Sequence, residues 1–185
     1  MARISLDPPR SLLLRLVEAY SRRRYGAVLE PGLALAHNRK VLLADLRFEQ
    51  RIAKWDALDA RLKHLALMVS AARIGCEWCM DFGHWEAHGL GLPHDLVAKV
   101  PMWREHRDAF SELELLVMEY AEAMTATPPE VTDELSARLL KDLGEPAFVE
   151  LTAVVAVENL RSRVNSAFGL TGQGFSDRCE TPLPS

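Results

Sequence analysis

Apolar residues recur every three or four positions along most of this 185-residue chain, the spacing that places them on one face of an α-helix. Leu62, Leu65 and Val69 show this spacing clearly. Strand signals are nearly absent, because no stretch alternates convincingly between apolar and polar residues and no Asn-Gly or Asp-Gly pair joins two apolar runs. The pattern therefore predicts an all-α fold, a helical bundle of about seven or eight helices.

Capping and turn residues divide the chain into helical segments. We expect these segments over residues 12–24, 41–48, 58–74, 76–88, 94–100, 111–124, 131–143 and 146–168, with a short helix between 25 and 38. Gly75 predicts a break just before residue 76, and Gly144 predicts the end of the helix before it. Since no fixed-period repeat or interdomain linker occurs, residues 1–185 are predicted to form one domain with a flexible tail over 172–185.

Composition and charge exclude several classes of protein. Hydrophobic residues make up 49% of the chain and charged residues 26%, which indicates a globular domain. The formal net charge of −4 gives no electrostatic reason to expect nucleic acid or an anionic membrane as a partner. No run of about 18 apolar residues could span a bilayer, and the first nine residues lack the apolar core of a secretory signal. We therefore expect a cytoplasmic protein.

Two of the three cysteines, Cys76 and Cys79, are spaced C-x-x-C. One helical turn separates them, so their sulfurs can meet on one face and form a disulfide that constrains little of the unfolded chain. This spacing also lowers a thiol pKa and creates a reversible dithiol/disulfide couple. A helix starting after Gly75 would place Cys76 where free N–H groups favour a thiolate. We interpret the pair as redox-active; the alternative is two buried cysteines that act as small hydrophobic residues.

Zinc binding is a second interpretation of the same segment, because His84 and His88 complete a zinc-finger set of residue types with the two cysteines. One straight helix cannot bring these four side chains around an ion, since they spread over ~18 Å along its axis. We therefore expect no metal and no cofactor.

The last long helix carries an unusual group of polar residues among its apolar positions. These residues are Glu158, Asn159, Arg161, Arg163 and Asn165. Polar groups need partners when they are buried. The group either braces neighbouring helices, which we favour, or lines a pocket.

Four segments resemble the carboxymuconolactone decarboxylase and alkylhydroperoxidase D-like superfamily: Arg61–Leu67, Ala71–Phe82, Ala87–Leu92 and Asn159–Asn165. The resemblance covers roughly residues 40 to 175 and implies an all-helical, homo-oligomeric fold of the alkylhydroperoxidase D-like type, in which the C-x-x-C opens a helix in a buried cleft. In the thiol-active members the second cysteine attacks a hydroperoxide and the first resolves it as a disulfide. The resemblance thus implies Cys79 as the attacking thiol, Cys76 as the resolving thiol, a small hydroperoxide substrate and a dithiol reductant.

Three positions depart from the thiol-active pattern. His64 stands where those members have a Glu, Gly83 where they have a His, and Trp78 where they often have another His. His64 is our candidate acid/base group, because imidazole titrates near neutrality. We therefore expect a thiol-dependent oxidoreductase that reduces hydroperoxides. Two alternatives remain: a non-catalytic helical binding or scaffold protein, and a carboxymuconolactone decarboxylase-like enzyme, for which no proton donor or lactone site is identifiable.

Overall fold

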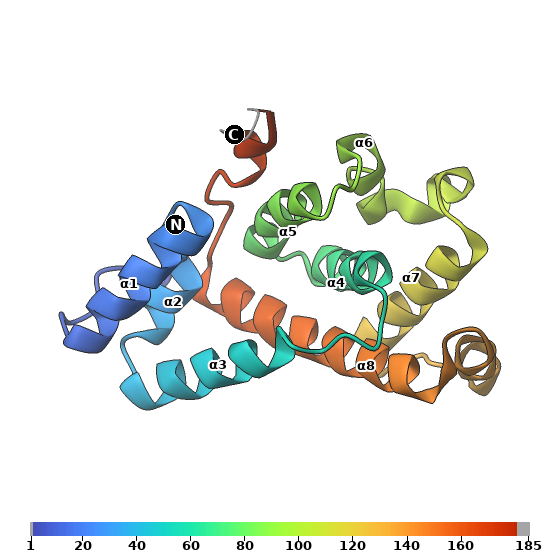
Figure 1. Cartoon of the computed structure of the whole chain (residues 1–185), viewed down its shortest axis with the longest axis horizontal. Coiled ribbons are helices and arrows are strands. Elements are labelled where there is room, and N and C mark those ends of the chain that lie inside the picture. Colours follow the sequence, from blue (N-terminus) through green and yellow to red (C-terminus); the bar gives the residue numbers. More distant parts are fainter. Residues whose placement is uncertain (1, 181–185) are drawn as a thin grey trace. The chain divides into compact units, whose positions relative to one another are not determined.

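The computed structural model describes residues 2–180, with the side chains of 179 and 180 excepted. Helices make up its secondary structure: α1 (Leu12–Tyr25), α2 (Glu30–Leu35), α3 (Arg39–Ile52), α4 (Ala60–Ile74), α5 (Glu77–Gly89), α6 (His94–Val97), the 3-10 helices η1 (Val100–Glu105) and η2 (Arg107–Ala109), α7 (Glu112–Thr125), α8 (Asp133–Phe168) and η3 (Ser176–Glu180) (Figure 1). No strand occurs among the described residues. The predicted all-α fold is therefore confirmed.

The contacts within the chain divide it into two compact units. One comprises the residues up to Trp55 together with Ala167–Thr171, and therefore contains α1, α2 and α3. The other comprises Asp56–Ser166 together with the residues from Gly172 onward. The sequence predicts a single domain over 1–185, with no sign of this division. The C-x-x-C pair of Cys76 and Cys79 lies in the second unit.

Helix α4 is the central element of the second unit. Asp59 caps its N-terminus by accepting hydrogen bonds from the backbone N–H groups of Arg61 and Leu62. Leu65 and Ala66 on this helix have no exposed surface. The helix packs against α5, α7 and η1, and Figure 1 shows it between α5 and α7. A helix covered on several sides reads as apolar around most of its circumference, which agrees with the sequence of α4.

Ion pairs join α4 to α7 and α8. Arg61 pairs with Glu114 of α7, and Lys63 pairs with Glu150 of α8. Burial alone would raise the pKa of the Glu114 carboxyl, but hydrogen bonds from Arg61 and Ser111 outweigh that effect and lower it. Ser111 and Glu114 also form a capping box at the start of α7.

Helix α8 bends where the sequence predicts two helices. Gly144 has a φ of +75°, so the backbone leaves the helical region there and resumes it before Pro146. The second part of α8 carries the polar group noted in the sequence. Of that group, Glu158 and Asn165 are buried, and Ser162 between them is fully buried. None of the described helices is long and apolar enough to cross a membrane.

The segment after α8 differs from the tail that the sequence predicts over 172–185. The Asp81 carboxylate of α5 accepts hydrogen bonds from the backbone N–H groups of Gln173, Phe175 and Ser176, and from the Ser176 hydroxyl. Phe175 is fully buried and contacts Trp78, whose indole N–H donates to Gln173. One aromatic ring and one carboxylate thus hold residues 173–176 on α5. Residues 181–185 of the predicted tail lie outside the described part.

Candidate active site

The C-x-x-C pair begins helix α5. Gly75 ends α4 with a φ of +79°, a left-handed conformation that few residues other than glycine adopt. Cys76 is the N-cap of α5, and its sulfur accepts a hydrogen bond from the backbone N–H of Cys79 at 3.2 Å. The break predicted from Gly75 is thereby confirmed. The Cys76 sulfur occupies the place that a Ser or Asp oxygen usually takes, where N–H groups and the helix dipole favour a negative charge.

A disulfide joins Cys76 and Cys79, whose Cα atoms lie 5.3 Å apart. The two sulfurs differ in access to solvent, since Cys76 is 1% exposed and Cys79 is only half-buried. A thiol that arrives from solvent therefore reaches Cys79 more readily. Attack there would expel Cys76 as the leaving thiolate, and the helix N-terminus stabilises that thiolate.

The Cys79 sulfur also meets two polar side chains of α8. The Ser162 hydroxyl and the Asn165 side-chain amide each lie 3.4 Å from it, oriented to donate hydrogen bonds. These residues are three positions apart on one helix, so they share a face. Both are buried. Asn165 belongs to the polar group singled out in the sequence, whereas Ser162 carries no local signal and was not predicted.

Glu158 lies one helical turn before Ser162 and contacts it. Its Oε1 atom is 2.6 Å from the Ser162 hydroxyl oxygen, and the side chain is buried. Burial raises the pKa of Glu158 to about 7, and the negative charge of Glu86 on α5 acts in the same direction. Arg161, whose Nη1 is 3.6 Å from Oε2, and the Ser162 hydrogen bond oppose this rise. The sequence suggested that Glu158 braces helices or lines a pocket; the structure places it two hydrogen bonds from a cysteine sulfur.

His64, the candidate acid/base group of the sequence, is buried in α4 and hydrogen-bonds to the backbone of Gly83 on α5. Burial lowers the pKa of its imidazole to about 4, and nearby His84 adds to the effect. The ring is therefore neutral at pH 7. Its Nε2 atom is buried and has no hydrogen-bond partner among the described residues. The Cys79 N–H thus donates to the Cys76 sulfur, whereas His64 hydrogen-bonds to the backbone of Gly83 rather than to either sulfur.

Gly83 lies where α4 and α5 approach each other closely. A Cβ atom at this position would collide with the sulfur of Met68 on α4. A histidine, which the thiol-active pattern has here, would require the Met68 side chain to shift. Glycine at this position avoids that contact.

The zinc interpretation finds no geometric support in the described residues. The sulfurs of Cys76 and Cys79 are bonded to each other, and the His84 ring packs against His94 with 5.7 Å between ring centroids. Among the side chains that the structure describes, no group of three or more His, Cys, Asp or Glu residues is arranged to hold a metal ion.

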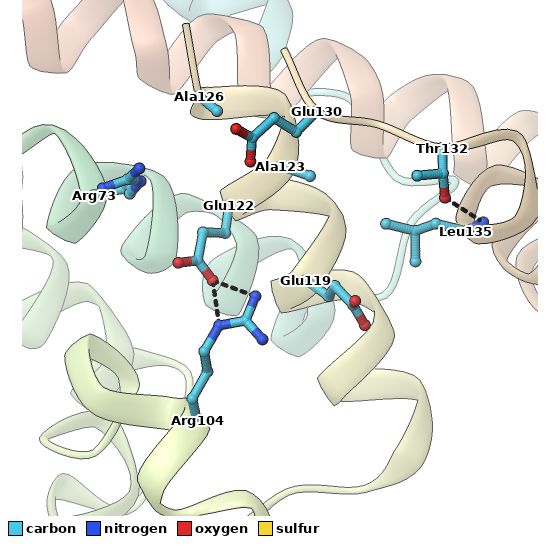
Figure 2. A pocket seen from close by; sticks show the side chains of 9 residues that line it. All are labelled: Arg73, Arg104, Glu119, Glu122, Ala123, Ala126, Glu130, Thr132 and Leu135. Carbon is cyan, nitrogen blue, oxygen red and sulfur yellow. Dashed lines mark hydrogen bonds and ion pairs between the residues drawn. The ribbon is translucent and has the colours of Figure 1, made fainter. Parts of the chain in front are cut away.

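A separate pocket of about 210 Å³ lies between α4, η1 and α7 (Figure 2). Arg73, Arg104 and Glu122 are among its lining residues. Arg104 Nε donates a hydrogen bond of 3.0 Å to Glu122 Oε2, and Arg104 Nη2 forms an ion pair of 3.0 Å with the same oxygen. The cysteine pair is not part of this lining. The disulfide of Cys76 and Cys79 therefore lies outside this pocket.

Comparison with known proteins places this geometry among similar folds. No family model matches the chain. In solved structures, a variant of the debrominase Bmp8 in complex with 2,3,4-tribromopyrrole has a TM-score of 0.81 at 18% identity, covering 97% of both chains. An uncharacterized peroxidase-related protein from Silicibacter sp. TM1040 has a TM-score of 0.81 at 16% identity, covering 96% of this chain and 94% of its own. At these identities the likeness establishes the fold alone.

One relative is more similar to this chain in sequence than these solved structures are. The uncharacterized protein YnjA of Escherichia coli strain K12 is 33% identical over 179 residues, which cover 95% of this chain and 96% of YnjA. The chain belongs to the same protein family as YnjA of Escherichia coli.

Proposed function

We propose that this protein is a thiol-dependent oxidoreductase of the carboxymuconolactone decarboxylase and alkylhydroperoxidase D-like superfamily, and that it reduces hydroperoxides through Cys76 and Cys79. The observation that carries the proposal is the environment of the Cys79 sulfur, which is half-buried and lies 3.4 Å from both the Ser162 hydroxyl and the Asn165 amide. Two donors aimed at one sulfur stabilise a thiolate. A same-fold neighbour described as peroxidase-related supports the assignment.

The proposed reaction runs in three steps. The Cys79 thiolate attacks one oxygen of the hydroperoxide, so a sulfur–oxygen bond forms, the O–O bond breaks, and the departing alkoxide takes up a proton to become an alcohol. The Cys76 thiol then attacks the sulfenic sulfur of Cys79, and the disulfide forms with release of water. A dithiol reductant finally attacks Cys79, expels Cys76 and returns two electrons and two protons.

Each cysteine has a structural reason for its role. Cys79 is the more accessible sulfur, which suits both attack on a substrate and attack by the reductant. Cys76 is nearly inaccessible and accepts the Cys79 N–H at the start of α5, which suits a resolving and leaving group. His64 remains a proposed acid/base group; with a pKa of about 4, its imidazole is neutral at pH 7.

The proposal also includes a cytoplasmic location and a homo-oligomeric state. Leu12, Leu16 and Tyr20 support the second point, since they are exposed at four-residue intervals and form an apolar stripe along α1. Light scattering at micromolar concentration should report a dimer or a larger assembly. A monomer mass would contradict this part of the proposal.

Hydroperoxide consumption coupled to a dithiol reductant tests the function directly. We expect steady turnover by the wild-type protein, none by Cys79→Ser, and a single turnover by Cys76→Ser that leaves a sulfenic acid reactive toward dimedone. Cys179→Ser is the matched control and should behave like the wild type. Consumption by the wild type no faster than by Cys79→Ser would overturn the proposal and favour a non-catalytic scaffold.

A further inference from the structure

Three side chains form a line from the interior of the second unit to the Cys79 sulfur. Glu158 Oε1 lies 2.6 Å from Ser162 Oγ, and Ser162 Oγ lies 3.4 Å from Cys79 Sγ. Glu158 is 5% exposed and Ser162 has no exposed surface, so water does not separate them from their partners. If Glu158 only braced the helices, an apolar residue could do the same without the cost of burying a carboxyl group.

The hydroxyl of Ser162 has only one hydrogen, and this limits which hydrogen bonds can coexist. If Glu158 carries a proton, its O–H donates to Ser162 Oγ, and the Ser162 O–H is then available to donate to the Cys79 sulfur. If Glu158 is a carboxylate, Ser162 donates to it, and a Cys79 thiol donates its own S–H to Ser162. The two arrangements differ by the transfer of one proton between sulfur and carboxyl group.

We propose that Glu158 holds the proton that Cys79 releases when it becomes a thiolate, and that the Ser162 hydroxyl relays it. The use of that proton in hydroperoxide reduction rests on the proposed function. The relay itself rests on the line of contacts. During turnover, the thiolate forms as Glu158 becomes protonated. The alkoxide that leaves the hydroperoxide then takes this proton from Glu158 and becomes an alcohol, so the site needs no proton from solvent in this step.

The charges around Glu158 suit this role. Glu86 faces it from α5, Arg161 lies beside it on α8, and burial together with Glu86 brings its pKa to about 7. A group that titrates near neutrality can both take up and release a proton at physiological pH. Asn165 donates to the same sulfur and carries no exchangeable charge, so it stabilises the thiolate without competing for the proton.

Alkylation of the reduced protein as a function of pH tests the relay without any hydroperoxide. Because Cys79 and Glu158 interact, they should lose their protons in two steps, and the wild-type alkylation rate should rise in two steps, the lower one near pH 7. Glu158→Gln should leave a single step, and Ser162→Ala should reduce the amplitude of the lower step about fivefold or more. Ser70→Ala, which removes another fully buried serine hydroxyl, should match the wild type.

Infrared titration supplies a second measurement that a structural role would not affect. The carbonyl stretch of a protonated buried carboxyl group should weaken only in part through the lower step, because Glu158 is protonated while Cys79 is a thiolate. The band should vanish through the upper step, and Glu158→Gln should lack it. Retention of the lower step in Glu158→Gln, or absence of the band from the wild type between pH 6 and 8, would overturn the relay. A wild-type protein that shows both signals but consumes no hydroperoxide would overturn the proposed function instead. If Glu158→Gln does not fold, Ser162→Ala and the wild-type infrared band decide the question.

Discussion

The Asp81 carboxylate accepts the backbone N–H of Gln173 at 2.6 Å, although the two residues are separated by most of α5 through α8 along the chain. The same carboxylate also receives two further backbone N–H groups and a hydroxyl, from Phe175 and Ser176. Burial would raise the pKa of Asp81, but these hydrogen bonds outweigh it and lower the pKa. A single acid side chain thus fixes the segment that covers part of α5.

Asp81→Asn should release this segment. An amide presents one oxygen and one N–H₂ group, so it cannot accept all four hydrogen bonds. We expect the free energy of unfolding to fall by about 1–3 kcal/mol and cleavage between residues 171 and 178 to become faster. Denaturant unfolding and limited proteolysis measure these changes. Asp95→Asn, at an exposed site on α6, is the control; equal proteolysis of both variants would show that Asp81 does not hold the segment.

The contribution of Asp81 should also depend on pH. Its pKa is lowered in the folded protein, so the stabilisation is present above the ordinary value of 3.8 and is lost as the pH falls through the lower, folded-state pKa. The difference in stability between wild type and Asp81→Asn should therefore shrink in strong acid. A difference that stays constant down to low pH would contradict this assignment.

Gly83→Ala should destabilise the contact between α4 and α5. The added Cβ atom meets the Met68 sulfur, and a side chain so close must shift. Overpacking of this kind typically costs about 1–3 kcal/mol, measurable by thermal or denaturant unfolding. Combining it with Met68→Ala should recover part of the loss, because the smaller side chain makes room. Gly89→Ala, at a position with open space around its Cβ, should cost less than Gly83→Ala.

Features set by neighbouring residues could be predicted from the sequence. The break at Gly75, the bend at Gly144 and the capping box of Ser111 and Glu114 each depend on residues within one or two turns. Propensity and capping are local effects, so they appear in the sequence itself. The C-x-x-C is local in the same sense, because both sulfurs belong to one turn.

Features set by packing between distant segments could not be predicted. Ser162 approaches Cys79 across 83 residues, and Phe175 approaches Asp81 across 94. A serine on a helix and a lone phenylalanine after one have no periodic signal. The polar group on the last helix could be identified from the sequence, but its contacts could not. The position of Glu158 near a cysteine follows only from the packing of α8 against α5, which places Ser162 beside a sulfur of α5.

His64→Gln should make stability less dependent on pH between about 4 and 6.5. The folded-state pKa of His64 is lowered from 6.5 to about 4, so the unfolded chain binds a proton in this range and the folded protein does not. Wild-type stability should therefore fall as the pH drops through this window, by at most about 1.4 kcal/mol per pH unit from this residue. Chemical unfolding at several pH values measures the slope. His88→Gln, at an exposed site on α5, should keep the wild-type slope.

Glu158→Gln should have the opposite dependence on pH. Its folded-state pKa is raised from 4.5 to about 7, so the folded protein retains a proton that the unfolded chain has already lost between these values. The favourable contribution of the protonated carboxyl is complete below 4.5 and disappears as the pH rises to 7. Glutamine stays neutral throughout, so we expect the variant to match the wild type near pH 4.5 and to exceed its stability at pH 8 by up to roughly 3 kcal/mol.

Unfolding of the disulfide-bonded proteins measures this difference without interference from thiol titration. Glu130→Gln, at an exposed site before α8, is the control and should follow the wild type at every pH. If Glu158→Gln is less stable than the wild type at pH 8, the carboxylate must be stabilised by Arg161 more than burial opposes it. Glu158 would then be charged at neutral pH and could not take up the proton of Cys79, so this stability measurement also checks the relay independently of any reaction.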